Sequence, residues 1–189
     1  MIKSPLAGRY ELLRAQFYVN PSIHSLRGKF YDFELQIVFG FVADVGSGGT
    51  RAAGQSGLLP ANQIRIVLLF EAGQKCNPIL TPITNIANQT NALNGTATTA
   101  ASIPLCRLIP ENTGFELYRG SSLFNGCPQT VAFAVATTPS FISFSQLAKF
   151  NKWLNNNGGL GSTDEHPQAQ LYGRPIYAGT VSSFTCPSV

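Results

Sequence analysis

The feature that most constrains the fold is a run of alternating side chains between Lys29 and Val45. Apolar residues take every second position from Tyr31 to Phe41, and polar or small residues take most positions between them. A period of two places alternate side chains on opposite faces of a β-strand, so this run predicts a half-buried strand. The residues of this strand predicted to lie in the core are Phe33, Leu35, Ile37 and Phe39.

The polar face of the same run carries Asp32, Glu34, Gln36 and Gly40, with Val38 as its one large apolar residue. A face opposite the core is expected to meet water, so we predict that Asp32 and Glu34 are solvent-facing. An alternative is that these two carboxylates pair with Arg27 or Lys29 of a neighbouring chain.

Other segments also have the chemistry of strands, separated by Gly, Pro and Asn turn formers. The apolar faces of two of them predict further core residues, namely Ile66, Leu68, Val131, Phe133 and Val135. The predicted strands are residues 10–19, 63–71, 105–109, 115–119, 130–137 and 171–185.

One helix is predicted, beginning at Ser143. Ser143 and Gln146 have the spacing of a capping box, and apolar residues then follow a helical period to Leu154. Residues 77–102 show no such period and are interpreted as a long irregular loop. The predicted fold class is mainly β: a single-domain β-sandwich or jelly roll with one α-helix in its C-terminal half and long irregular loops. Residues 1–9 are predicted to be an N-terminal arm, and residues 10–189 a single β-rich domain.

Charged residues are scarce, at 12% of the 189 residues, against about 25% in an ordinary soluble domain. None lies between Lys75 and Arg107, none between Arg119 and Lys149, and none after Arg174. We interpret these gaps as uncharged surfaces that contact other subunits, because a free monomer usually carries a mixed charged surface.

Composition argues against nucleic-acid and membrane partners. No two basic residues are adjacent, and nucleic-acid binding usually needs a clustered basic face. The longest unbroken apolar stretch, Val131 to Ala136, is far shorter than the roughly 20 residues of a membrane-spanning helix. The N-terminal residues lack the apolar region of a signal peptide.

No catalytic, cofactor or metal site is predicted. The chain has only two histidines, His24 and His166, and the second lies in a run, residues 164–167, interpreted as a solvated loop. The Gly-rich residues 46–49 lack the lysine of a phosphate-binding loop. Residues 54–57 are interpreted as a flexible loop rather than a serine nucleophile motif.

The four cysteines form no CxxC pair, so the spacing of a structural zinc site is absent. Without a visible export signal, free buried thiols are favoured over disulfides. If the cysteines are oxidised, the pair Cys76 with Cys106 is preferred.

These observations predict a structural, self-assembling protein rather than an enzyme: a virion component such as a phage head-decoration (cement), capsid or tail subunit. Its partners would be copies of itself and other structural subunits, and it would assemble in the host cytoplasm. The alternative is an extracellular β-sandwich that binds a carbohydrate or a surface receptor. The predicted interface residues are Ile2, Leu6, Phe17, Tyr18 and Trp153.

Overall fold

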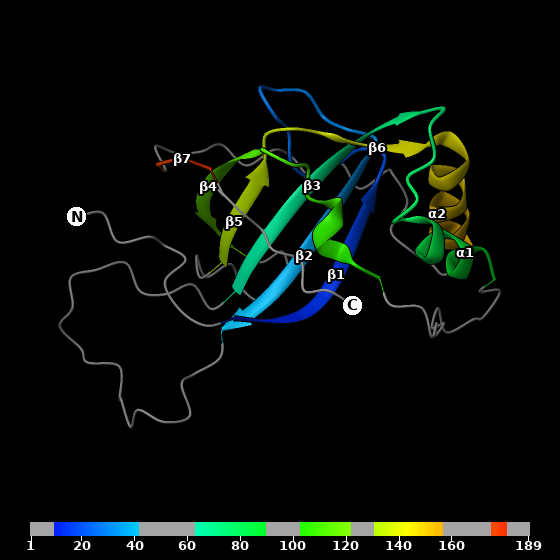
Figure 1. Cartoon of the computed structure of the whole chain (residues 1–189), viewed down its shortest axis with the longest axis horizontal. Helices are drawn as coiled ribbons and strands as arrows, with labels where there is room; N and C mark the ends of the chain where they lie inside the picture. The colour runs from blue at the N-terminus through cyan, green and yellow to red at the C-terminus, as the bar shows by residue number, and fades with distance from the viewer. Residues whose placement is uncertain (1–9, 42–62, 90–102, 122–130, 157–174, 181–189) are drawn as a thin grey trace.

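The computed structural model describes residues 10–41, 63–89, 103–121, 131–156 and 175–180 of the chain. Its strands form one mixed sheet in the order β1-β2-β3-β5-β4-β7, with β6 paired to the far end of β3 (Figure 1). The strands are β1 (Tyr10–Val19), β2 (Phe33–Phe41), β3 (Gln63–Gly73), β4 (Gly114–Gly120), β5 (Val131–Ala136), β6 (Ser140–Ser143) and β7 (Tyr177–Thr180).

The sheet combines antiparallel and parallel pairs. β1, β2 and β3 are successive antiparallel neighbours, whereas β5 and β6 both run parallel to β3. β4 is antiparallel to β5 and to β7. The prediction of a mainly β protein is confirmed. The finer prediction of a sandwich or jelly roll is not confirmed, because all the described strands belong to this one sheet.

One face of the sheet, here called the apolar face, carries the main core. Phe33, Leu35 and Ile37 of β2 are buried on it, as predicted, whereas Phe39 is only partly buried. Leu147 and Phe150 of helix α2 (Phe144–Asn156) belong to the same cluster, and the Phe150 ring lies 4.9 Å from the Phe33 ring. Alternation along β2 therefore identified the residues that helix α2 covers.

The predicted capping box at the start of α2 is present. The Gln146 backbone N–H donates to Ser143 Oγ at 3.2 Å, and the Ser143 N–H donates to Gln146 Oε1 at 3.2 Å. Gln146 also exchanges hydrogen bonds with the backbone of Asn77, at 2.9 and 2.7 Å, which ties α2 to the start of the preceding helix.

Two predictions between β3 and β4 were wrong. Part of the predicted long loop is helix α1 (Thr81–Gln89), which packs beside α2 of the same chain (Figure 1). The predicted strand at residues 105–109 is a 3-10 helix, η1 (Leu105–Leu108), which buries Leu108 in the core. Within the described residues, no helix is long and apolar enough to cross a membrane.

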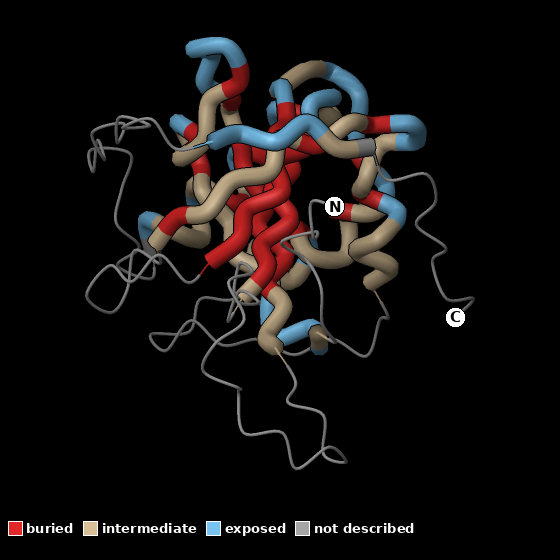
Figure 2. Tube along the Cα trace, turned by 90° about the vertical axis from the view of Figure 1, so that its left-hand side faces the viewer, coloured by how far each residue is buried: buried red, intermediate tan, exposed pale blue. Residues whose placement is uncertain are grey.

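The opposite face of the sheet, here called the polar face, is covered by the segment between β1 and β2. That segment turns at Arg27 and Gly28, whose φ angles of 52° and 79° suit a two-residue hairpin turn of type I′. The turn holds Leu26 and Tyr31 against Val67 and Val135 in a second apolar cluster. Figure 2 shows the result, in which the central strands are buried along most of their length.

Candidate functional site: a buried polar cluster

A group of polar side chains lies beneath this covering segment on the polar face. Cross-strand pairing places Tyr18 opposite Glu34, Gln16 opposite Gln36, and Val38 opposite Arg65. Opposite residues share a face of the sheet, so these side chains gather on one side of β1, β2 and β3. Glu34, Gln36 and Arg65 are 0%, 1% and 1% exposed. The polar cluster is defined as Tyr18, His24, Glu34, Gln36, Arg65 and Tyr118.

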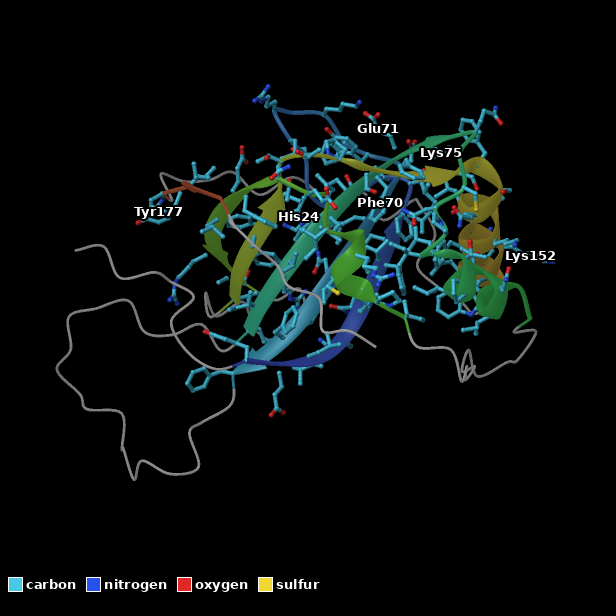
Figure 3. All side chains as sticks on the ribbon, viewed as in Figure 1. His24, Phe70, Glu71, Lys75, Lys152 and Tyr177 are labelled. Carbon is cyan, nitrogen blue, oxygen red and sulfur yellow. The ribbon has the colours of Figure 1, made fainter. Side chains whose placement is uncertain are left out.

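His24 joins two distant parts of this cluster. Its Nδ1 lies 2.8 Å from Glu34 Oε1, and its Nε2 lies 2.6 Å from the Tyr118 hydroxyl on β4. Because an ionised carboxylate only accepts, Nδ1 is the donor to Glu34. The His24 backbone N–H also donates to Glu34 Oε2 at 2.8 Å. Both ring nitrogens of His24, labelled in Figure 3, are therefore engaged within the cluster.

Glu34 is held as a carboxylate although it is fully buried. Burial alone would raise its pKa, but the charge of His24 and the hydrogen bonds from His24 and Gln36 outweigh that cost. The Gln36 amide donates to Glu34 Oε1 at 2.7 Å. The net effect is a Glu34 pKa below its ordinary value.

Arg65 extends the same row of hydrogen bonds toward the middle of the sheet. Its Nη1 donates to Gln36 Oε1 at 2.9 Å, and its Nη2 donates to Gln63 Oε1 at 3.3 Å. The guanidinium carbon lies 5.7 Å from the centre of the Phe133 ring, a cation–π distance. Burial lowers the pKa of Arg65, but a guanidinium keeps its proton in proteins. Arg65 therefore places a fixed positive charge inside the polar face.

Two buried side-chain atoms on β1 lack a hydrogen bond of normal geometry. Among the described residues, neither the Tyr18 hydroxyl nor Gln16 Oε1 has a partner of normal geometry. Burial and the charge of Glu34 raise the pKa of Tyr18, whereas the charges of Arg65 and Arg14 and the contact of its hydroxyl with the Arg65 guanidinium oppose that rise. A buried donor and a buried acceptor left open in this way call for an explanation, such as a bound water or ligand.

The prediction for the polar side of β2 was wrong at Glu34. Glu34 is buried and bonded to His24 of its own chain, because residues 20–32 cover this face. Asp32 is partly buried, and its Oδ2 accepts from the Ala72 backbone N–H at 2.8 Å. Lys29 forms its salt bridge with Glu71 of the same chain.

The predicted interface residues on described segments lie as follows. Phe17 packs in the core, with its ring 5.2 Å from that of Phe150, and Tyr18 belongs to the polar cluster. Trp153 is partly buried on α2. Ile2 and Leu6 lie outside the described residues, as do the loops at 46–49, 54–57 and 164–167 and with them His166. That the five predicted interface residues contact other subunits stays a prediction.

The cysteine prediction needs correction. Cys106 is disulfide-bonded, whereas Cys76 is a free and exposed thiol. The prediction of a free thiol is confirmed for Cys76, but its predicted burial was wrong. For Cys106 the prediction of a free thiol was wrong, and the preferred pair of Cys76 with Cys106 is excluded. Cys76 lies 3.6 Å from the Thr81 hydroxyl at the start of α1.

The family model of the eukaryotic-type carbonic anhydrases matches residues 1–179 of the chain. The chain belongs to the carbonic anhydrase family. Among curated proteins no match is found.

Solved structures resemble the chain over most of its length. An α-carbonic anhydrase from Thermovibrio ammonificans, solved with the inhibitor sulfanilamide, is 26% identical with a TM-score of 0.66; 89% of this chain and 63% of that chain are covered. A halotolerant carbonic anhydrase from Dunaliella salina is 20% identical with a TM-score of 0.67; the shares are 89% and 60%. Dioscorin complexed with ascorbate is 18% identical with a TM-score of 0.66; the shares are 90% and 62%. The chain thus spans less than two thirds of the length of these structures.

Family membership overturns the functional prediction. Carbonic anhydrases are enzymes, so the predictions of a phage or capsid structural protein and of a non-enzyme were wrong. The reasoning from charge failed for a structural reason. One uncharged gap, between Arg119 and Lys149, contains β5, which is buried along its whole length at the centre of the sheet. This uncharged strand therefore belongs to the interior of the sheet and not to its surface.

Carbonic anhydrases use a catalytic zinc ion, so we asked whether the residues of this chain could hold one. Catalytic zinc in this family is held by three histidines. The chain has only His24 and His166, so it cannot supply three. Among the described residues, no group of three His, Cys, Asp or Glu side chains is placed to hold a metal ion. The residues present do not fit the family's zinc site.

Sequence reasoning missed His24, Gln36, Arg65 and Tyr118 as members of a common site. The available signal was an arginine between Ile64 and Ile66, in a predicted strand that carries apolar residues on both faces. A buried strand does not tolerate a charge unless other polar groups meet it. That rule would have pointed to polar partners on the neighbouring strands.

Proposed function

We propose that this chain recognises bicarbonate at the Arg65 end of the polar cluster, as a member of the carbonic anhydrase family. The family name describes chemistry on carbonic acid, whose singly charged base is bicarbonate. A buried guanidinium suits a small planar oxyanion, because its N–H groups match two oxygens of one carboxyl-like group.

The observation that carries the proposal is a pair of buried atoms on β1 without a hydrogen bond of normal geometry: the Tyr18 hydroxyl, which contacts Arg65, and Gln16 Oε1, opposite Gln36. Bicarbonate has oxygens that accept hydrogen bonds and one O–H that donates. The Tyr18 hydroxyl can donate to an oxygen, and Gln16 Oε1 can accept from the O–H. A simple carboxylate would use the Tyr18 hydroxyl but would leave Gln16 Oε1 open, so the two orphaned atoms together favour bicarbonate.

The remaining cluster positions the guanidinium. Gln36 accepts from Arg65 and donates to Glu34, so its amide is oriented from both sides. Glu34 is in turn fixed by His24, and His24 by Tyr118. This row holds Arg65 in place without setting a carboxylate directly against it, since the charge of Glu34 lies one side chain away.

The test is calorimetric titration of the purified chain with sodium bicarbonate at fixed ionic strength, beside the Tyr18→Phe variant. This variant removes a hydroxyl that contacts Arg65 without a hydrogen bond of normal geometry in the free protein, so the fold should tolerate it. Loss of one hydrogen bond to a charged ligand should weaken binding about 10- to 100-fold. Tyr177→Phe, on the exposed strand β7, is the matched control and should bind as the parent chain does.

Equal affinity of the parent chain and Tyr18→Phe would contradict the proposal. So would a titration of the parent chain that shows no heat beyond that of sodium chloride. In that case a buried water molecule would be the simplest hydrogen-bond partner for Tyr18 and Gln16.

A further inference from the structure

We infer that the polar cluster works without a zinc ion and that Arg65 supplies its positive charge. The inference goes beyond the proposed recognition of bicarbonate, because it concerns which cation the site contains. Its starting point is the absence of a third histidine anywhere in the 189 residues.

The one described histidine is already committed. A histidine that binds zinc gives one ring nitrogen to the metal and commonly bonds a carboxylate through the other. His24 has the carboxylate contact, through Nδ1 to Glu34, but its Nε2 lies 2.6 Å from the Tyr118 hydroxyl. The His24 ring also packs against Phe133, at 5.2 Å between ring centres. A metal at Nε2 would have to displace the tyrosine that the imidazole now holds.

Electrostatics point the same way. The Arg65 guanidinium is buried and carries its charge at any pH at which the chain is folded. Two cations in a poorly hydrated interior repel each other far more strongly than they do in water. Arg65 therefore disfavours a divalent cation on the same face of the sheet while attracting an anion there. In metal-dependent carbonic anhydrases the positive charge that attracts an anion is the zinc ion, which also acts as a Lewis acid and as the source of bound hydroxide.

The first experiment measures zinc in the purified, dialysed full-length chain by elemental analysis. We expect far less than one zinc per chain, and no change of melting temperature on adding zinc chloride or EDTA. A metal bound only by the folded chain would raise the melting temperature. One zinc per chain that survives dialysis, and whose removal lowers the melting temperature, would overturn the inference. Zinc that is lost in His24→Gln or His166→Gln would overturn it equally.

The second experiment tests Arg65 as the cation, with bicarbonate as the probe and EDTA in every sample. Arg65→Lys keeps a positive charge and should retain part of the melting-temperature rise caused by bicarbonate. Arg65→Gln should lose that rise, whereas Arg107→Gln, at an exposed site on η1, should keep all of it. If Arg65→Gln fails to fold, the comparison rests on Arg65→Lys, which should bind bicarbonate at least several-fold more weakly than the parent chain. Unchanged bicarbonate binding in Arg65→Gln or in Arg65→Lys would overturn the role of Arg65.

The two proposals can fail separately. A zinc-free chain that does not bind bicarbonate would remove the proposed function and the role of Arg65 as the cation that attracts bicarbonate, and would leave only the inference of a zinc-free cluster standing. Bicarbonate binding that depends on stoichiometric zinc would remove the inference of a zinc-free cluster and leave the proposed recognition of bicarbonate standing.

Discussion

On the apolar face of the sheet, Phe33, Leu35 and Ile37 meet the core through apolar contacts, whereas Glu34 and Gln36, between them on the same strand, are equally buried on the polar face. The first set is stabilised by removal of apolar area from water. Glu34 and Gln36 lose their hydrogen bonds to water on folding. Hydrogen bonds with His24, with Arg65 and with each other replace them. The two faces of β2 are thus stabilised differently, one by apolar packing and the other by specific hydrogen bonds.

This difference has consequences for mutation and for function. Apolar packing loses energy roughly in proportion to the atoms removed. A buried polar network instead loses disproportionately when one member is removed, since the remaining members stay buried without partners. The polar face is therefore where small chemical changes should have large effects, and it is also where the Tyr18 hydroxyl and Gln16 Oε1 lie.

The largest effect is expected from Glu34→Ala, which leaves His24 and Gln36 without their carboxylate partner. Each buried donor left without its acceptor costs about 1–3 kcal/mol. Glu34 accepts from His24 Nδ1, the His24 backbone N–H and the Gln36 amide. Urea unfolding should show this loss in the free energy of unfolding. Glu71→Ala is the matched control, because Glu71 forms an exposed salt bridge with Lys29 and such pairs contribute about 0–1 kcal/mol. Similar losses for the two variants would remove the distinction between buried and exposed carboxylates.

On the apolar face, Ile37→Ala should lower the free energy of unfolding by about 2–5 kcal/mol. Ile37 is 3% exposed, so the substitution leaves a cavity among the core side chains. Leu12→Ala, on the exposed half of β1, should change stability by less than about 0.5 kcal/mol. An Ile37→Ala variant as stable as the parent chain would show that the alternation of β2 is assigned to the wrong faces.

A smaller effect is expected where α2 begins to cover the apolar face. Ser143→Ala removes the hydroxyl that accepts from the Gln146 backbone N–H and should cost about 0.5–2 kcal/mol. Lys152→Ala, at an exposed position of the same helix, should be nearly neutral in the same unfolding experiment. Equal stability of the two variants would mean that the capping box contributes little.

Much of the apolar face could be predicted from the sequence, because alternation and capping are local signals. The pattern of β2 identified Phe33, Leu35 and Ile37, and the spacing of Ser143 and Gln146 located the start of α2. These features depend on the spacing of residues only a few positions apart, which can be read directly from the sequence.

The polar face could not be predicted in the same way. Alternation shows that the two faces of a strand differ, but it does not show that the polar one meets water. Whether Glu34 is exposed depends on the path of residues 20–32, which carry its partner His24. His24 is in turn bonded to Tyr118 on β4, much later in the chain. Helix α1 was missed for a related reason, since its Thr- and Asn-rich sequence is a weak helix former and packing against α2 supports it.

Glu34 also makes the stability of the fold depend on pH. Its folded pKa lies below the ordinary value of 4.5, so the unfolded chain binds more protons than the folded one between the two values. The carboxylate therefore stabilises the fold fully above the ordinary pKa, and this contribution is lost as the pH falls through the folded pKa. A chain carrying Glu34→Gln should lack this component of acid unfolding.

The most direct test of a buried, charged polar cluster is the titration of the Glu34 side-chain carboxyl, followed by carbon-13 NMR in the folded chain. Glu71, which is exposed, serves as the internal reference. The structure predicts that Glu34 stays ionised to a pH below its ordinary pKa of 4.5, because His24 and Gln36 stabilise the carboxylate. A Glu34 carboxyl that takes up its proton at or above pH 4.5 would contradict the account, since burial would then outweigh the cluster.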